Sequence, residues 1–187
     1  MRASAIALLV AALLLGGCAE KHEASTALPT TSAAETTESL PTVGPADFPV
    51  PDEARTKDAA GAEAFLRYFI DLLNRQQAIP NGGPIRALGP ECDECLRIAK
   101  VFDSAASAGQ HYEGGKLTLN DVATPQLSET AAEIAFGVRV EAVSLKDAAG
   151  EPVVDGQAKE LSDASSGIGL VWSDKDKTWL VDGLTIG

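Results

Sequence analysis

Apolar residues recur at helical spacing after residue 58. Between residues 59 and 77 they repeat every three or four positions, at Ala62, Phe65, Leu66, Phe69, Leu72 and Leu73. This spacing predicts an amphipathic helix, with Asp58 as its N-cap. The run PNGGP at 80–84 ends the helix, and a short turn is expected over 85–88. A second helix is predicted over 91–108, with one apolar side formed by Ile98, Phe102 and Ala105.

From residue 111 onward the hydrophobic period shortens to two, which is typical of strands with one buried face. The alternation is strongest at Ile134, Phe136, Val138, Val140 and Ala142. Further strands are predicted around 117–121, over 153–161, from 168 to 172, and from 179 to 186. Helices followed by antiparallel strands predict an α+β domain, with the N-terminal helices packed on a bent antiparallel sheet.

The first 18 residues, MRASAIALLVAALLLGGC, have the order of a secretory signal: a basic residue, an apolar core and small residues. The apolar core over 5–15 is too short to cross a bilayer as a helix. The run LGGC at 15–18 resembles a bacterial lipobox. That resemblance implies removal of 1–17, lipidation (as with palmitate) of Cys18, and anchoring on the extracytoplasmic face of the cell membrane.

Residues 18–57 are rich in Thr, Ser, Pro and Ala and show no apolar periodicity. Such a composition favours a disordered tether, because no core offsets the entropy of ordering it. The folded domain is therefore predicted to span 58–187.

The chain of 187 residues carries 27 acidic and 15 basic side chains, a formal net charge of −12. This balance argues against nucleic acid as a partner, which requires a basic surface. Two histidines and three cysteines offer little material for a metal cluster, and we expect no cofactor.

Two segments carry a resemblance to a known family: GAEAFLRYFIDLLN at 61–74 and LGPECDEC at 88–95. Together with the lipobox, they resemble an uncharacterised family of actinobacterial lipoproteins, known as a domain of unknown function. The order of two helices, a bent meander and a hairpin bearing tryptophans resembles the nuclear-transport-factor-2-like (cystatin-like) cone. The resemblance implies fold and location but no activity, and the cone fold commonly forms homodimers through its sheet.

Cys92 and Cys95 remain as a pair once Cys18 is assigned to the anchor. At positions i and i+3 of a helix start, outside the reducing cytoplasm, they predict a structural disulfide. A redox-active Cys-x-x-Cys is an alternative, although Glu91, Asp93 and Glu94 disfavour a thiolate there. A metal site is a further alternative.

No catalytic motif is found, and catalysis is not expected. Tyr68, Asp71 and His111 form a speculative polar set for a cavity between helices and sheet. The leading hypothesis is a non-catalytic binding or accessory domain in the cell envelope, with an envelope protein or a small ligand as partner. The alternatives are a ligand carrier or enzyme that uses the cone cavity, and a thiol oxidoreductase.

Overall fold

The computed structural model of the protein describes residues 41–187. The predicted signal peptide (1–17), the lipidated Cys18 and the predicted tether up to residue 40 lie outside the described residues. Within 41–187, no helix is both long enough and apolar enough to cross a membrane.

The helices of the described region all precede its strands. Asp58 caps the first long helix as predicted: its carboxylate accepts a hydrogen bond from Gly61 N at 2.7 Å. This bond and a second from the Thr56 hydroxyl lower the pKa of Asp58. The segment 85–88, expected as a turn, belongs to a short helix, because Pro84 is compatible with the first turn of a helix. The helices are η1 (Asp52–Arg55), α1 (Ala59–Ala78), α2 (Gly83–Leu88) and α3 (Asp93–Ser107).

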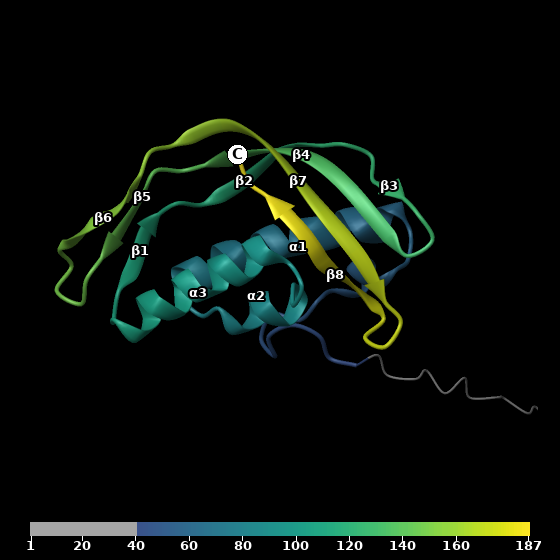
Figure 1. The fold of residues 1–187 in the computed structure, drawn as a ribbon, viewed down its shortest axis with the longest axis horizontal. Helices are drawn as coiled ribbons and strands as arrows, with labels where there is room; N and C mark the ends of the chain where they lie inside the picture. The colour runs from purple at the N-terminus through teal and green to yellow at the C-terminus, as the bar shows by residue number, and fades with distance from the viewer. Residues whose placement is uncertain (1–40) are drawn as a thin grey trace, which may run out of the picture. The chain divides into compact units, whose positions relative to one another are not determined.

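The strands pair antiparallel throughout and form two sheets. One sheet has the order β1-β5-β6, and the other has the order β2-β4-β7-β8, with β3 paired to β4. Figure 1 shows the strands arching over α1, α2 and α3. The strands are β1 (His111–Gly114), β2 (Leu117–Val122), β3 (Gln126–Leu127), β4 (Ala131–Val140), β5 (Val143–Lys146), β6 (Pro152–Ala158), β7 (Leu161–Ser173) and β8 (Thr178–Thr185). The predicted α+β class, with helices packed on a bent antiparallel sheet, is confirmed.

Two strand boundaries differ from the prediction. The strand expected over 153–161 ends at Ala158, and β7 starts at Leu161 rather than at Ile168. The first half of β7 is polar and exposed, so its sequence shows no alternation. This half is a strand because it pairs with β4, and the pairing extends to Leu161 opposite Val140. Tertiary pairing overrides weak local preference here.

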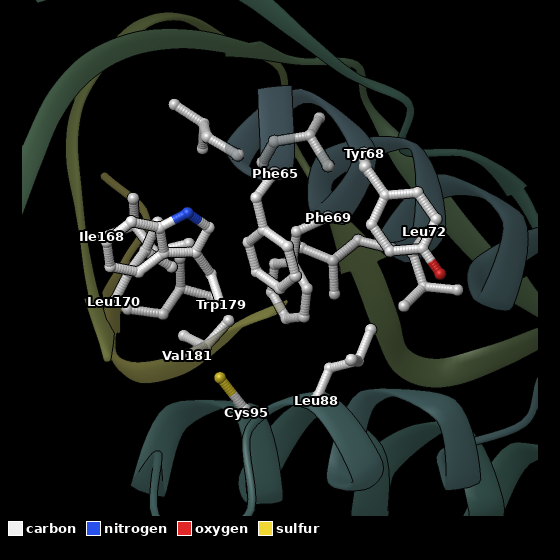
Figure 2. Packing of buried hydrophobic residues seen from close by; sticks show 14 of the residues in the cluster. Phe65, Tyr68, Phe69, Leu72, Leu88, Cys95, Ile168, Leu170, Trp179 and Val181 are labelled. Atoms are coloured by element: carbon white, nitrogen blue, oxygen red, sulfur yellow. The ribbon is translucent and has the colours of Figure 1, made fainter. Parts of the chain in front are cut away.

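The hydrophobic core lies between the helices and the concave side of the larger sheet (Figure 2). Phe65 and Phe69 of α1 are fully buried, with ring centroids 6.3 Å apart. Trp179 of β8 is also buried, and its indole N–H donates to Thr56 O at 2.9 Å. Trp172 lies half-buried against Trp179 with its ring edge-on, so both tryptophans serve the core rather than an open surface.

The folded unit begins earlier than the predicted Asp58. Residues 41–57, here called the N-terminal arm, pack onto α1, with Val50 4% exposed and Ala54 fully buried. The Phe48 ring stacks on the ring of Tyr68 with centroids 5.2 Å apart. The predicted tether is therefore too long at its C-terminal end. The sequence of residues 41–57 does not reveal this packing, because a few scattered apolar residues without periodicity are enough to bind a segment to the surface of a helix.

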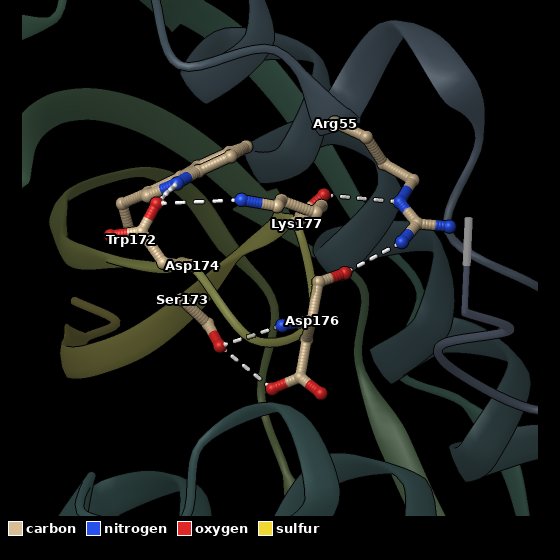
Figure 3. A network of polar contacts seen from close by, with 6 residues as sticks. All are labelled: Arg55, Trp172, Ser173, Asp174, Asp176 and Lys177. Carbon is tan, nitrogen blue, oxygen red and sulfur yellow. Dashed lines mark hydrogen bonds and ion pairs between the residues drawn. The ribbon is translucent and has the colours of Figure 1, made fainter. Parts of the chain in front are cut away.

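Arg55 fastens the N-terminal arm to the turn between β7 and β8 (Figure 3). Its guanidinium donates to the carbonyl oxygens of Lys177 at 3.1 Å, Asp176 at 2.6 Å and Pro41 at 2.8 Å. The turn itself is closed by Ser173, whose hydroxyl donates to the Asp176 carboxylate at 2.7 Å. One side chain thus joins the two ends of the arm to each other and to a turn that is distant in the sequence.

We predict that Arg55→Ala lowers the free energy of unfolding by about 1–2 kcal/mol, because three carbonyl groups lose a charged donor. Urea unfolding followed by tryptophan fluorescence measures the change. Lys57→Ala, an exposed cation two residues away, is the matched control and is expected to have no measurable effect. Equal stability of both variants would show that the Arg55 bonds do not stabilise the folded unit.

Candidate functional site

The speculative polar set of Tyr68, Asp71 and His111 does not converge on one cavity. Tyr68 is 6% exposed, and its hydroxyl donates to Phe48 O at 2.9 Å. Burial raises the pKa of Tyr68 to about 12. Asp71 lies on the exposed side of α1, and His111 is the exposed first residue of β1. Tyr68 therefore holds the N-terminal arm, and the other two residues face solvent.

The space between α1 and the larger sheet is filled by aromatic side chains. Phe65 and Phe69 of α1 are fully buried, and Phe136 of β4 is 5% exposed. The predicted cavity site at this position is therefore replaced by core packing.

An apolar groove opens instead beside the C-terminal half of α1. It has a volume of about 290 Å³, and it lies between α1, α3 and the strands β1, β2, β4 and β5. Leu73 and Leu117, both buried, contribute to its lining, while Val101 is 43% exposed. Its lining residues are Leu73, Gln77, Glu94, Arg97, Ile98, Val101, Phe102, Tyr112, Gly115, Leu117, Val140, Val143 and Ile186. We call this set the apolar groove.

The groove exists because a long strand ribbon bends at a pair of glycines. β1 and β2 pair with β5 and β4, and backbone hydrogen bonds continue across the bend, from Gly115 N to Ala142 O and from Glu141 N to Lys116 O, each 3.0 Å long. Gly114 and Gly115 have φ values of +74° and +78°, which residues other than glycine rarely adopt. A Cβ at Gly114 would also collide with Ala142 O. The bend lets the smaller sheet continue beyond the larger one, past the end of the core.

Two polar side chains of α1 hold the bend in place. The Asn74 amide bonds both backbone groups of Leu117, donating to its O at 2.9 Å and accepting from its N at 2.8 Å. One turn later on α1, Gln77 Nε2 donates to Gly114 O at 2.7 Å. These bonds satisfy strand-edge groups that would otherwise be exposed.

The charged residues of the groove lie at one end of α3 and neutralise each other. Arg97 donates from Nε and Nη2 to the two carboxylate oxygens of Glu94, at 2.7 Å and 2.5 Å. This bonding lowers the pKa of Glu94 and raises the pKa of Arg97. A carboxylate held in this state is a poor proton donor or acceptor near neutral pH. The groove is therefore suited to bind an apolar group rather than to transfer a proton.

A second hollow adjoins the apolar groove, with which it shares Gln77 and Tyr112. Its volume is about 300 Å³, and its remaining lining comes from Asn74, Ala78, Gly114 and Lys116. The Tyr112 ring stands at the boundary and packs edge-on against Phe102, with centroids 5.7 Å apart. The two hollows form one mixed site: the groove is mostly aliphatic apart from the Glu94–Arg97 pair, and the second hollow is polar near Lys116.

The predicted Cys92–Cys95 disulfide is present at the start of α3, with the two Cα atoms 5.2 Å apart. Both cysteines are fully buried, and Cys95 N donates to Cys92 Sγ at 3.1 Å, which caps the helix. Thiol–disulfide exchange needs access to a sulfur. The burial therefore favours the structural interpretation over the redox one.

Within residues 41–187, no group of three or more His, Cys, Asp or Glu side chains is arranged to hold a metal ion.

The sequence pattern predicts Ile98 and Phe102 as apolar positions of the second long helix, but it does not predict the groove that they line. The available signal was the glycine pair at 114–115 between two apolar segments, which marks a bend.

No protein-family model matches the chain, and no curated protein matches it. Among solved structures, the intermembrane space region of the chloroplast protein ARC6 is 17% identical, with a TM-score of 0.47, over 70% of this chain and 97% of that one. A variant of the protein Rd1NTF2_05 is 12% identical, with a TM-score of 0.37, over 67% of this chain and 99% of that one.

A protein of Xanthomonas campestris, titled a calcium/calmodulin-dependent protein kinase II association domain, is 14% identical, with a TM-score of 0.37, over 66% of this chain and 84% of that one. The likeness to these proteins, some of nuclear-transport-factor-2-like fold, is one of fold alone. The α+β class itself rests on the helices and strands described above.

We predict that Gly115→Ala lowers the free energy of unfolding by about 3 kcal/mol. The positive φ alone accounts for about 1–2 kcal/mol, and a Cβ here would also collide with the Val143 side chain and with Gln77 Nε2. Gly150→Ala is the matched control, because Gly150 has φ +85° but no atom within 4 Å of an added Cβ. Denaturant unfolding of both variants separates the two effects. A Gly115→Ala cost no larger than that of Gly150→Ala would refute the close packing of Gln77 on the bend.

Proposed function

We propose that this protein is a cell-envelope lipoprotein that displays a non-catalytic binding domain, and that it belongs to the uncharacterised actinobacterial lipoprotein family it resembles. The N-terminal sequence supports the anchor: an apolar core over 5–15 is followed by LGGC, with Cys18 where a lipidated cysteine is required. The mature chain would be held at the extracytoplasmic face of the membrane by its lipid. The acidic surface would contribute little, since anionic lipids repel it.

The apolar groove is the observation that carries the binding function. Aliphatic and aromatic side chains from six elements and the C-terminus converge on one concave site, which is the usual form of a ligand pocket. Its volume of about 290 Å³ suits a small molecule or one side chain of a partner better than a protein surface. We therefore favour a small apolar ligand over an envelope protein as the partner.

The alternative functions receive less support. An enzyme using the cone cavity would need a polar interior, whereas Phe65, Phe69 and Phe136 fill that space. A thiol oxidoreductase would need an accessible sulfur, whereas Cys92 and Cys95 are buried. Neither alternative is favoured by a specific contact in the described residues.

Replacement of Cys18 tests the anchor. We predict that Cys18→Ser moves most of the protein from the membrane fraction of cells to the soluble fraction or the medium, because no acyl chain can be attached. Immunoblotting of the fractions measures the shift, and Ser25→Ala serves as the control that changes a residue outside the lipobox. Unchanged membrane association of Cys18→Ser would contradict lipid anchoring.

Replacement of Val101 tests the groove. We predict that Val101→Gln weakens binding of the uncharged fluorescent probe N-phenyl-1-naphthylamine by about fivefold, because part of an apolar wall is lost, a cost of about 1 kcal/mol. Val154→Gln is the matched control, since Val154 is 87% exposed on β6 and distant from the groove lining.

Fluorescence titration gives the dissociation constants, and thermal unfolding verifies that both variants fold. Absence of probe binding by the unmodified chain, or equal effects of the two substitutions, would contradict a binding function for the groove.

A further inference from the structure

We propose that the natural ligand is a single-chain amphiphile with an anionic headgroup, a carboxylate or a phosphate. This inference rests on the proposed binding function and adds the ligand's chemical class. Its apolar chain occupies the apolar groove, and its headgroup lies at the mouth, near Arg97 and Lys116.

The lining of the groove fits a flexible hydrocarbon chain. Seven of its residues are aliphatic, and they surround the hollow from α1, α3, β2, β4, β5 and the C-terminus: Leu73, Ile98, Val101, Leu117, Val140, Val143 and Ile186. Aliphatic walls without directed polar groups favour a ligand part that makes only dispersion contacts. A volume of about 290 Å³ accommodates one chain rather than two, at the lower limit of about 300–1,000 Å³ for ligand pockets.

The two hollows hold more cations than carboxylates, although the whole chain is acidic. The protein has a formal net charge of −12. The combined lining of the groove and the second hollow nevertheless holds two cations, Arg97 and Lys116, and one carboxylate, Glu94. A third hollow is lined by both Asp71 and Lys116. The two cations themselves, rather than a net positive field, therefore provide the contacts for an anionic group.

Both cations retain donors for a headgroup. Glu94 engages Nε and Nη2 of Arg97, so the Nη1 donors have no partner within residues 41–187. Lys116 forms no ion pair within the same residues. Guanidinium and ammonium groups are the usual donors to carboxylate and phosphate oxygens.

Competition between charged and uncharged ligands tests the inference. The experiment uses the full chain carrying Cys18→Ser, so that the protein brings no acyl chain of its own. Dodecanoate and dodecanol, kept below their aggregation limits, displace N-phenyl-1-naphthylamine in a fluorescence titration. We predict that dodecanoate binds about tenfold more tightly than dodecanol, and that Lys116→Gln removes most of this difference, about 1.4 kcal/mol.

Three further variants locate the two parts of the ligand. Arg97→Gln also weakens the binding of dodecanoate. Because it leaves Glu94 unpaired, Lys116→Gln is the cleaner test of the headgroup. Val101→Gln weakens the binding of dodecanoate and of dodecanol equally, because it alters only the apolar wall. Lys175→Gln, an exposed cation in the turn after β7, is the control and leaves both affinities unchanged.

The outcomes separate the two proposals. Equal affinities for dodecanoate and dodecanol, or no effect of Lys116→Gln, would refute the anionic headgroup while the groove still binds apolar molecules. Failure of both ligands to displace a bound probe would refute the single-chain amphiphile. Failure of the probe itself to bind would refute the proposed binding function.

Discussion

The burial of α1 on more than one side is the constraint on which the rest of the structure depends. Its buried residues occur around most of the helix, including Gly61, Ala62, Phe65, Leu66, Tyr68, Phe69, Ile70, Leu72, Leu73 and Gln76. A helix with this distribution cannot rest on a sheet alone, because a sheet covers one side. The larger sheet and the N-terminal arm cover different sides, and α2 and α3 complete the enclosure. Truncation of a core residue such as Phe65 would therefore disturb several neighbours at once, with a typical cost of about 3–5 kcal/mol.

The polar residues of α1 explain why the sheet bends where it does. Asn74 and Gln77 are three positions apart, so they lie on the same side of the helix. They bond the strand edge on both sides of the glycine pair, at Leu117 and at Gly114. The same helix thus supplies the core with its apolar residues and fixes the ribbon with its polar ones. The apolar groove follows from this arrangement, since the bent ribbon continues past the last large core residue of α1.

Sequence periodicity predicted most of the fold but little of the site. The helix over 59–77 and the strand through Phe136 show strong patterns, because each buries one regular face. The first half of β7 and the N-terminal arm escaped prediction, because pairing with β4 and packing on Tyr68 determine their structure. Tyr68 shows the limit for functional residues: its hydroxyl, which suggested a polar cavity, instead bonds Phe48 O.

The groove was beyond prediction for a related reason. Its lining comes from residues between 73 and 186, and no local pattern links Leu73 to Ile186. The disulfide, by contrast, could be anticipated, because a separation of three residues at a helix start limits the geometry.

The proposed function requires a domain that is held by its N-terminus and binds with another part of its surface. An isolated exposed apolar residue such as Val154 needs no explanation. A concave lining of aliphatic side chains is different, because leaving it hydrated costs about 25 cal/mol for each Å² of apolar surface. None of residues 41–57 lines the groove, although the arm packs on the same helix. The arm can therefore transmit the attachment of the chain to α1 and to the β7–β8 turn without covering the groove. Under the proposed function, anchoring and binding would thus use separate surfaces of one helix.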